Sequence, residues 1–589
     1  MYGYHKKLLE IHVGQKEVRE ISLKDDLLNT TLGGKGLAIH LLSEKATGNL
    51  DPFSPENPLI ILGGPVTGTQ VWGSCRHGIY GKSPLTGLFG ESYSGGTLAR
   101  SISAAGVDGI IVVGKSHEPL WLEISSNGVT FHDASWLWGK LTFETEQEIL
   151  SWLKENRKDL KFPSVATIGP AGENLVRFAL VANDLWRSAG RTGMGALMGS
   201  KGIKAIAFWG NRSKEVADPT GLKKHTKAIY QTFKDSKVVL GYRTYGTPSM
   251  VDAMDAIGAL PSNYWRNGKV PHKGFIDAEA LHTRMEVRPH ACLNCFMACG
   301  RLGTVKEGPY KDLTIEGPEY ETIYAFGALC GIRTIEEIAH INKICDGLGM
   351  DTISAGNIIG LIIEASKRRD FSLKIEPGDT QEIGKLLLAI AHRNGIGEIL
   401  GEGIQKASEI LGIGELAVHV KGMEPAGYDP RVLKGMALAY ATSPRGACHL
   451  RSTFYKAELL GLFNPEDLES MVKVFVDWED RLTLMDTMIF CRFYRDLYPW
   501  ETLEEIYGLV TGSKGNQLRQ IAKRISDEIR LFNLKQGMDP SQDWLPKRFF
   551  KEALPETGEI LKEEEVREMI RLYYSQRGWN HKGQPKGYV

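Results

Sequence analysis

The stretch "PHACLNCFMACG", residues 289–300, places three thiols within eight positions: Cys292, Cys295 and Cys299. The whole chain has only eight cysteines in 589 residues, which is too few for a disulfide framework. Thiols clustered in this way are typical of metal ligands or catalytic groups. From the spacing alone an iron–sulfur cluster, a zinc ion and unligated thiols all stay open. The iron–sulfur cluster is favoured because structural zinc sites usually combine two close pairs of ligands.

A fourth ligand for such a cluster must come from another part of the chain. The remaining cysteines are Cys75, Cys330, Cys345, Cys448 and Cys491. Their periodicity does not choose among them, and four of the five lie in apolar or glycine-rich surroundings that are typical of a small buried side chain.

Composition limits the classes of partner. Lys plus Arg and Asp plus Glu both total 71, so no net positive field exists to attract nucleic acid. The N-terminal "MYGYHKKLLEIHV" has no continuous apolar segment, and no stretch reaches the ~18–20 apolar residues of a membrane span. We therefore predict a cytoplasmic protein without a nucleic-acid or membrane partner.

The pattern of apolar residues changes along the chain. Before residue 212, short apolar runs such as "DGIIVVGK" and "IKAIAFWG" alternate with glycine and proline turns, which predicts strands. Beyond it, runs such as "TIEEIAHINKICDGLG" have the helical period. We predict an α+β fold with a β-rich domain of mixed sheets (1–212) and two mainly helical domains (213–425 and 426–589). The three clustered cysteines fall in the second domain.

Ten stretches in order along the chain carry a resemblance to a known family. They include "YSGG", "RSAGRTGMG", "CLNCFMACG", "EGPEYET", "DGLGMD", "RGACHL" and "DTMIFC". With them the chain resembles the tungsten-containing aldehyde:ferredoxin oxidoreductase family from end to end. The resemblance implies a 4Fe–4S cluster on Cys292, Cys295 and Cys299 with Cys491 as the fourth ligand. Cys491 ends a motif that reads D-x-x-G-L-C in the family, where this chain has Ile489 and Phe490 for Gly and Leu.

The resemblance also implies a tungsten bis-pterin cofactor whose two phosphates share a magnesium ion. Two main-chain carbonyls would hold the magnesium, those of Tyr93 and Ser188, and Tyr93 stands where the family usually has Asn. Arg76 corresponds to an arginine between cluster and pterin. The implied cofactor-binding residues are Arg76, Tyr93, Ser94, Gly95, Gly96, Arg187, Ser188, Ala189, Gly190, Asp346, Met350, Asp351, Asp486 and Phe490.

For catalysis the resemblance implies a glutamate and a histidine as acid/base groups. His449 matches the histidine, and Glu321 is preferred to Glu319 for the glutamate. Considered without the resemblance, both glutamates would simply favour the start of a helix after Pro318. His449 would then be a hydrogen-bonded structural histidine.

The implied activity is oxidation of an aldehyde to a carboxylic acid, with electrons leaving through the cluster. The partner would be ferredoxin or a small polyferredoxin-like subunit, and a homodimer around a metal at Glu337 and His340 is a further arrangement. Two alternatives stay open: a related tungsten enzyme that reduces an aromatic acyl-CoA ring, and an electron-transfer iron–sulfur subunit without tungsten.

Overall fold

A computed structural model describes residues 1–586. The first 210 residues contain two six-stranded sheets, ordered β2-β1-β6-β3-β4-β5 and β11-β10-β9-β12-β7-β8. Their strands are β1 (Lys7–His12), β2 (Glu17–Ser22), β3 (Leu59–Leu62), β4 (His77–Lys82), β5 (Phe89–Ser94), β6 (Gly109–Val113), β7 (Leu120–Ser125), β8 (Gly128–Asp133), β9 (Ser164–Thr167), β10 (Val181–Asn183), β11 (Arg187–Ala189) and β12 (Ile203–Phe208). Each sheet has one parallel pair among antiparallel ones, which confirms the predicted mixed sheets.

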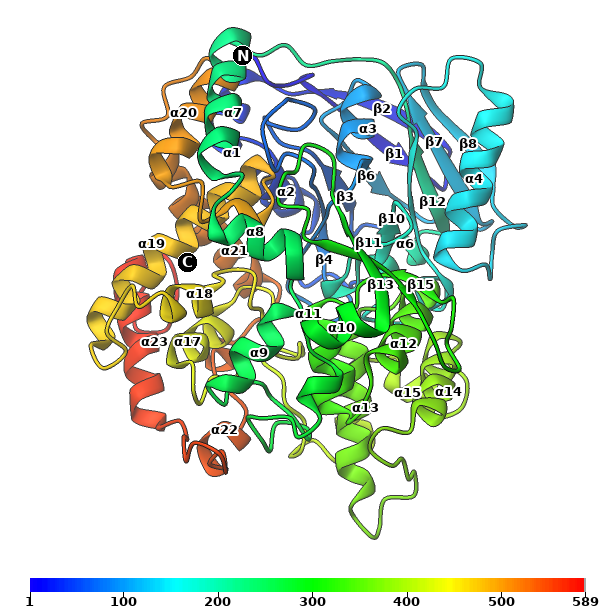
Figure 1. The fold of residues 1–589 in the computed structure, drawn as a ribbon. Coiled ribbons are helices and arrows are strands. Elements are labelled where there is room, and N and C mark those ends of the chain that lie inside the picture. The colour runs from blue at the N-terminus through cyan, green and yellow to red at the C-terminus, as the bar shows by residue number, and fades with distance from the viewer. Residues whose placement is uncertain (587–589) are drawn as a thin grey trace.

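The two sheets enclose an apolar core because their strands present branched side chains inward. Leu9 and Ile11 of β1 lie in one buried cluster with Leu120, Leu122 and Ile206 of the second sheet. Short helices cover the remaining faces: α1 (Asp25–Thr31), α2 (Gly34–Lys45), α3 (Leu98–Ala104), α4 (Thr142–Asn156), α5 (Pro170–Glu173) and α6 (Met194–Ser200). Figure 1 shows this region, blue to cyan, as the upper part of the molecule.

The rest of the chain is mainly helical, as predicted. The helices are α7 (Pro219–Phe233), α8 (Lys237–Tyr245), α9 (Ser249–Ala256), α10 (Ala278–Arg284), α11 (Tyr320–Thr322), α12 (Ile335–Leu348), α13 (Thr352–Ser366), α14 (Thr380–Ala391), α15 (Ile396–Leu400), α16 (Ile404–Ile410), α17 (Lys434–Thr442), α18 (Phe454–Leu459), α19 (Leu468–Met488), α20 (Trp500–Thr511), α21 (Leu518–Lys535), α22 (Arg548–Lys551) and α23 (Glu563–Arg577). A π-helix, Ile323–Leu329, directly follows α11. The boundaries near 212 and 425 stay predictions.

A third sheet interrupts this helical region. It consists of β13 (Met285–His290), β14 (Gly300–Val305) and β15 (Thr314–Glu316) in that order. β13 and β14 are antiparallel, with His290 opposite Gly300. The sheet therefore closes the two ends of the cysteine loop, residues 291–299.

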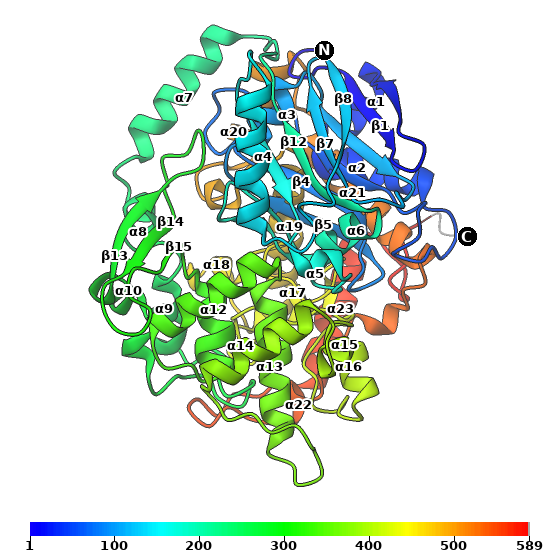
Figure 2. The same ribbon diagram turned by 90° about the vertical axis from the view of Figure 1, so that its right-hand side faces the viewer.

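The last third of the chain returns to the first. Both α19 and α21 pack against α2, so orange and blue segments lie side by side in Figures 1 and 2. This return brings residues from all three parts of the sequence together at the edges of the two large sheets. Within residues 1–586, no helix has the length and apolar character needed to cross a membrane.

Candidate active site

Two adjoining cavities lie where the three parts of the chain meet. The first, of about 280 Å³, is lined by all four predicted cluster cysteines, and we call it the cysteine cavity. The second, of about 300 Å³, is lined by Arg191, Arg445 and Arg451, and we call it the arginine cavity. The two share a wall made of Arg76, Tyr93, Trp186, Ser188, Glu316, Glu319, Glu321, His449 and Leu450.

The cysteine cavity brings Cys491 to the three clustered thiols from almost 200 positions away. The backbone N–H of Cys491 donates to the carbonyl of Gly73 at 2.9 Å, and the N–H of Gly73 donates to the carbonyl of Asn294 at 2.9 Å. Asn294 lies inside the cysteine loop and has a φ of 50°, so the loop turns sharply there. Cys330, Cys345 and Cys448 are not among the residues that line this cavity.

Cys75 also lines the cysteine cavity, although its sequence surroundings indicate a core residue. It is buried, and a hydrogen bond with its thiol, together with Arg187, lowers the pKa of Cys292 to about 6. Within residues 1–586, no three His, Cys, Asp or Glu side chains converge closely enough to hold a single metal ion. The thiols are thus arranged around a cavity.

The cavities lie at the edges of both large sheets. β5 is an edge strand of the first sheet and β11 is an edge strand of the second. Each therefore has a row of backbone groups that are not paired within its sheet. Tyr93, Ser94 and Gly95 from β5 and its end line the cysteine cavity together with Arg187 and Ser188 from β11. A Cβ on Gly95 would lie 2.8 Å from the Cys292 sulfur, so only glycine lets the backbone approach the thiols here.

Two predicted backbone residues stand behind this edge. The Gly96 carbonyl accepts a hydrogen bond from Leu293 N–H in the cysteine loop at 3.4 Å, and Ala189 is fully buried. Arg187 pairs with Glu316 at 2.6 Å, and Glu316 also contacts His290 at 2.9 Å. Arg187, one of the predicted cofactor-binding residues, therefore has a carboxylate partner.

The first D-x-x-G motif lines the arginine cavity. Asp346, Met350 and Asp351 all lie on its wall, and Gly190 lies next to Asp351. Asp351 caps the N-terminus of α13 by accepting from Ser354 N–H at 3.1 Å. Burial raises the pKa of Asp346 to about 7.

The second motif lies behind the wall of the cavities. Asp486 is buried and accepts from Arg451 Nη1 at 2.5 Å and from Arg492 Nε at 3.0 Å. Phe490 is buried and its ring packs at 5.2 Å from that of Tyr498. The direct cofactor contacts predicted for these two residues stay predictions.

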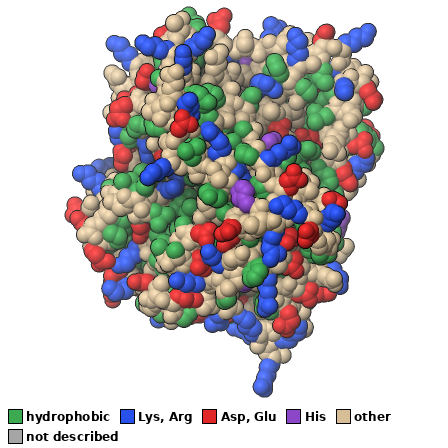
Figure 3. All heavy atoms as spheres, viewed as in Figure 1, with side chains coloured by type: hydrophobic (Ala, Val, Ile, Leu, Met, Phe, Trp, Pro, Cys, Tyr) green, Lys and Arg blue, Asp and Glu red, His purple; other side chains and the backbone are tan. Residues whose placement is uncertain are grey.

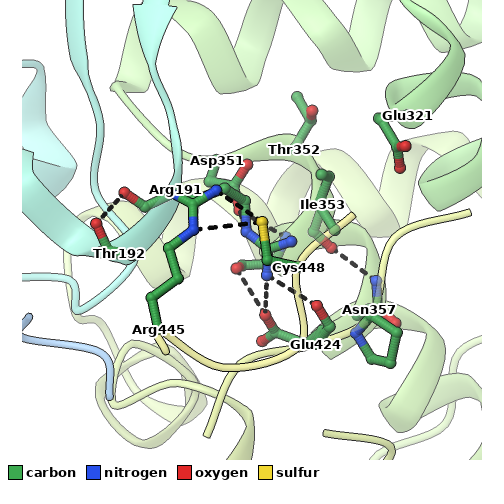
Figure 4. A network of polar contacts seen from close by, with 12 residues as sticks. Arg191, Thr192, Glu321, Asp351, Thr352, Ile353, Asn357, Glu424, Arg445 and Cys448 are labelled. Carbon is green, nitrogen blue, oxygen red and sulfur yellow. Dashed lines mark hydrogen bonds and ion pairs between the residues drawn. The ribbon is translucent and has the colours of Figure 1, made fainter. Parts of the chain in front are cut away.

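Arg191 and Arg445, which line the arginine cavity, belong with Cys448 to one network of polar contacts (Figure 4). Arg191 pairs with Asp351 at 3.1 Å and with Glu424 at 3.1 Å. The Cys448 thiol accepts from Arg445 Nη2 at 2.9 Å. Burial opposes its ionisation, but Arg445 and Arg451 outweigh burial and lower the pKa of Cys448 to about 7.

Glu321 and His449 face each other on the shared wall, with 3.5 Å between Oε1 and Nε2. Burial raises the pKa of Glu321 to about 8, although its other oxygen accepts from Gly427 N–H at 3.0 Å. Burial lowers the pKa of His449 well below its usual range, and the cationic Arg191 adds to this. At neutral pH the pair is therefore a mostly protonated carboxyl group beside a neutral imidazole.

Glu319 occupies a different part of the same wall. Its carboxylate accepts a hydrogen bond from the Thr247 hydroxyl, and burial raises its pKa. Its neighbouring charges are Glu316, Arg187 and Arg301. The geometry thus brings Glu321, and not Glu319, into contact with His449.

Aromatic side chains form the outer wall of the cysteine cavity beside His449. Tyr428 lies 5.6 Å from the His449 ring and stacks on Tyr455 at 3.9 Å. Tyr242, Tyr320 and Phe493 line the same cavity. Phe454, which precedes Tyr455 in the sequence, packs on Phe463 at 4.8 Å and is buried.

The Glu337 and His340 side chains both have contacts within the chain. The Glu337 carboxylate accepts from Thr334 at 2.9 Å, which places it in the cap of α12. His340 stacks on Tyr310 at 4.5 Å. A shared metal at a dimer interface stays a prediction.

Four charged or nucleophilic residues of the site were missed from the sequence: Cys75, Arg191, Arg445 and Arg451. The arginines stand in the stretches "RSAGRTGMG" and "SPRGACHLR", which were noted for their other residues. An arginine among glycines is a usable signal for an anion site, because guanidinium and close backbone approach are what phosphate binding requires.

Comparisons with known proteins show the family of the chain. Residues 8–210 match the family model "Aldehyde ferredoxin oxidoreductase, N-terminal domain", and residues 224–588 match "Aldehyde ferredoxin oxidoreductase, domains 2 & 3". These matches define the protein as an oxidoreductase. Tungsten-containing aldehyde ferredoxin oxidoreductases of Pyrococcus furiosus and Thermococcus kodakarensis are each 35% identical to this chain, over 99% of it and 97% of their own length. The chain belongs to the aldehyde ferredoxin oxidoreductase family.

A solved structure shares the fold at lower identity. The active-site complex BamBC of benzoyl coenzyme A reductase, solved with 1,5-dienoyl-CoA, superposes with a TM-score of 0.83. It is 23% identical and covers 99% of this chain and 96% of its own. The predicted fold class and family are both confirmed.

Proposed function

We propose that this chain is a tungsten–pterin enzyme that oxidises aldehydes to carboxylic acids, with water as the oxygen source. The observation that carries the proposal is the Glu321–His449 pair, 3.5 Å apart, on the wall between a cavity lined by thiols and a cavity lined by arginines. One side can take electrons away and the other can hold an anionic cofactor.

The arginine cavity fits a pterin cofactor with phosphate groups. Arg191 Nη1 and Arg451 Nε are buried and have no hydrogen-bond partner among the described residues, although both side chains line the cavity. Leaving buried donors unsatisfied costs ~1–3 kcal/mol each, which a bound anion would recover. Tyr93, Ser94, Gly95 and Gly96, with Arg187, Ser188, Ala189 and Gly190, would supply backbone groups from the two sheet edges. The carbonyls of Tyr93 and Ser188 would hold magnesium.

The cysteine cavity fits a 4Fe–4S cluster. Four thiolates are the ligand set that such clusters use, and Cys292, Cys295, Cys299 and Cys491 line one cavity. Arg76 lines both cavities, so it would lie between cluster and pterin. When bound, the metal cofactors would supply two-electron oxidation with oxygen transfer and the one-electron exit to ferredoxin or an iron–sulfur subunit.

The chain itself binds the aldehyde and moves its protons. Tyr428 and Tyr455 hold the organic part of the substrate and exclude water from the reacting carbon. Glu321 takes a proton at Oε1 as the carbon gains its oxygen, and a pKa near 8 suits this exchange because it lies close to working pH. Neutral His449 donates its single N–H to the carbonyl oxygen and orients it.

The test is anaerobic purification with metal analysis, followed by a panel of aldehydes with a viologen dye as acceptor. We expect tungsten and iron in the protein, and dye reduction that depends on aldehyde. Iron without tungsten would show an electron carrier instead. Turnover of an aromatic acyl-CoA, with none of any aldehyde, would assign the chain to the ring-reducing enzymes.

A further inference from the structure

The cysteine loop is covered on its outer side by α7 and α8. Arg243 of α8 donates to the carbonyl of Phe296, inside the loop, at 2.9 Å. Gly246, which ends α8, packs against the carbonyl of Cys299, where a Cβ would approach to 2.8 Å. From α7, the carbonyl of Thr226 accepts from Trp72 Nε1 at 2.9 Å. α8 therefore packs directly on the cysteine loop, and α7 packs on Trp72 beside it.

Three aromatic rings connect this cover with the loop. Tyr230 of α7 lies 5.6 Å from both Trp72 and Phe296, and Trp72 lies 5.2 Å from Phe296. Phe296 directly follows Cys295, whereas Tyr230 is 38% exposed. A continuous aromatic contact thus runs from the molecular surface to the cluster ligands.

The surface around Tyr230 is basic. Residues 219–245 contain six Lys or Arg and a single Asp, although the whole chain has equal numbers of acidic and basic side chains. Lys223, Lys224, Lys227 and Lys237 are exposed, and Lys234 is partly exposed with its ammonium 5.8 Å from the Tyr230 ring. Glu505 of α20 pairs with His225 of α7 at 2.9 Å, which adds a negative charge near the start of α7. The excess positive charge therefore lies on the later part of α7 and on α8.

Apolar side chains are also exposed on this surface, on α8 after Lys237. Val238, Leu240 and Tyr245 are 38%, 42% and 48% exposed. Figure 3 shows blue and green side chains together over this region, and Figure 2 shows α7 and α8 along the outside of the molecule. A small apolar centre with charges around it is the usual anatomy of a weak, transient interface.

We propose that this α7–α8 face, residues 219–245, is the docking surface for a small acidic one-electron carrier of the ferredoxin type. The inference rests on the proposed function, since it requires electrons to leave through the cluster. Oxidation of one aldehyde with one water yields a carboxylic acid, two protons and two electrons. Two oxidised carriers therefore dock in turn, each leaves reduced by one electron, and the protons pass to solvent.

The experiment compares two acceptors in one preparation. Wild type and Lys227→Glu/Lys237→Glu are assayed with aldehyde and either a small acidic ferredoxin that has a single [4Fe–4S] cluster or a viologen dye. The matched control is Lys154→Glu/Lys158→Glu, which makes the same charge change at exposed lysines at the end of α4. We expect kcat/KM for ferredoxin to fall ~10-fold or more in the α7–α8 variant at low salt, because electrostatic steering is lost. Added salt should reduce the difference in kcat/KM between wild type and this variant, because it screens the charges.

Dye reduction should be unchanged in both variants, which shows that fold and active site are intact. Ferredoxin reduction at the wild-type rate by the α7–α8 variant would overturn the docking surface while leaving the aldehyde activity standing. Absence of dye reduction in wild type would instead overturn the proposed function. Titration of ferredoxin into the purified wild type and both variants tests the docking surface independently of activity. Equal affinity for ferredoxin in all three proteins would rule out the α7–α8 face as the docking surface. A tightly bound subunit that co-purifies on α7 and α8 would also contradict a transient carrier.

Discussion

Glu321 has a carboxyl group whose environment opposes ionisation. Because burial raises its pKa to about 8, it is mostly protonated at neutral pH and becomes a base as the pH rises. We therefore expect kcat/KM for aldehyde to increase with pH through about 8. Glu321→Gln should lose this rise and ~10²–10⁴-fold in rate, whereas Glu319→Gln should keep the rise. The measurement is a dye-linked pH profile, and a rise retained in Glu321→Gln would assign the proton to another group.

The same raised pKa has a consequence for stability. The folded protein keeps a proton on Glu321 that the unfolded chain releases, so this residue's contribution to stability falls between the ordinary pKa of about 4.5 and about 8. Glu321→Gln has no proton to lose. The unfolding midpoint of Glu321→Gln should therefore rise relative to that of wild type as the pH is raised from about 4.5 to about 8.

Cys491 and Cys75 offer a direct test of the fourth cluster ligand. Both are buried and both line the cysteine cavity. We expect Cys491→Ser to lose iron and the broad visible absorption of the cluster, because serine is a poor ligand for iron–sulfur iron. Cys345→Ser, a buried thiol that is not among the cavity-lining residues, is the matched control and should keep its iron. Loss of iron in Cys75→Ser, with full iron in Cys491→Ser, would move the ligand to Cys75.

Spacing alone predicts three thiols that act together, because one turn within eight positions can bring their side chains to a single metal centre. The fourth cluster ligand could be predicted only from the family resemblance, since nothing in the local sequence distinguishes Cys491 from the other isolated cysteines. Cys75 was missed for the same reason. Its position depends on a backbone contact between Gly73 and Cys491, which are more than 400 positions apart in sequence.

Among the structural elements, α12 and α19 end in the same way. After α12, Gly349 has a φ of 79°, and Met350 N–H donates to the carbonyl of Cys345 at 2.9 Å. After α19, Ile489 has a φ of 67°, and Phe490 N–H donates to the carbonyl of Met485 at 2.8 Å. Both are left-handed C-caps of the kind in which glycine is preferred. The replacement of Gly by Ile therefore left the backbone turn in place.

Ile489 must then bear a backbone strain that Gly349 does not. A left-handed conformation costs a residue with a Cβ ~1–2 kcal/mol. Ile489 compensates by full burial of its side chain beside Gly34 and Gly64. We expect Ile489→Gly to be more stable than Ile489→Ala by ~1 kcal/mol, the reverse of the usual helix order. Leu484, inside α19, is the control, where Ala should be the more stable. Denaturant midpoints measure both pairs, and Ala above Gly at 489 would contradict the strain.

Helices with a clear apolar period were predictable, and α12, α13, α19 and α21 follow their sequence patterns closely. The third sheet was not predicted. β13 has the sequence "MEVRPH" and alternates buried and exposed positions only in part, and β15 is three residues long. β13 pairs with β14 across the cysteine loop, and β15 pairs with β14 across residues 306–313. This pairing outweighs weak local preferences.

On the scale of the whole molecule, the site depends on the return of the last third of the chain to the first. Lys35 of α2, Glu91 of β5, Arg451, Asp486 of α19 and Arg492 form one buried network across this contact. Its members are up to 457 positions apart, so no sequence pattern could assemble them. The motifs that resemble the family lie near these residues in the sequence, but they do not predict which acidic and basic residues pair.

The pairing of Glu91 with Arg451 leads to a prediction on the cohesion of the fold. Burial opposes the ionisation of Glu91, but Arg451, Lys35 and Arg445 outweigh it and lower its pKa to about 2. The stabilisation is therefore complete above the ordinary pKa of about 4.5 and is lost as the pH falls towards 2. Glu91→Gln should cost ~3–5 kcal/mol at neutral pH, since it leaves Arg451 with only Asp486 as a buried partner.

Chemical denaturation at neutral and acid pH measures both effects. Glu91→Gln should lose its difference from wild type as the pH falls below about 4.5, because wild type then protonates the same carboxylate. Glu91→Gln/Arg451→Met should be less destabilised than the sum of the single variants by ~1–3 kcal/mol, since the charges interact directly. Glu568→Gln, which breaks an exposed pair with Arg571, is the control and should keep a denaturation midpoint close to that of wild type. Equal stability of Glu91→Gln and wild type at neutral pH would mean that packing of α2 on α19 and α21, and not this network, holds the two ends of the chain together around the site.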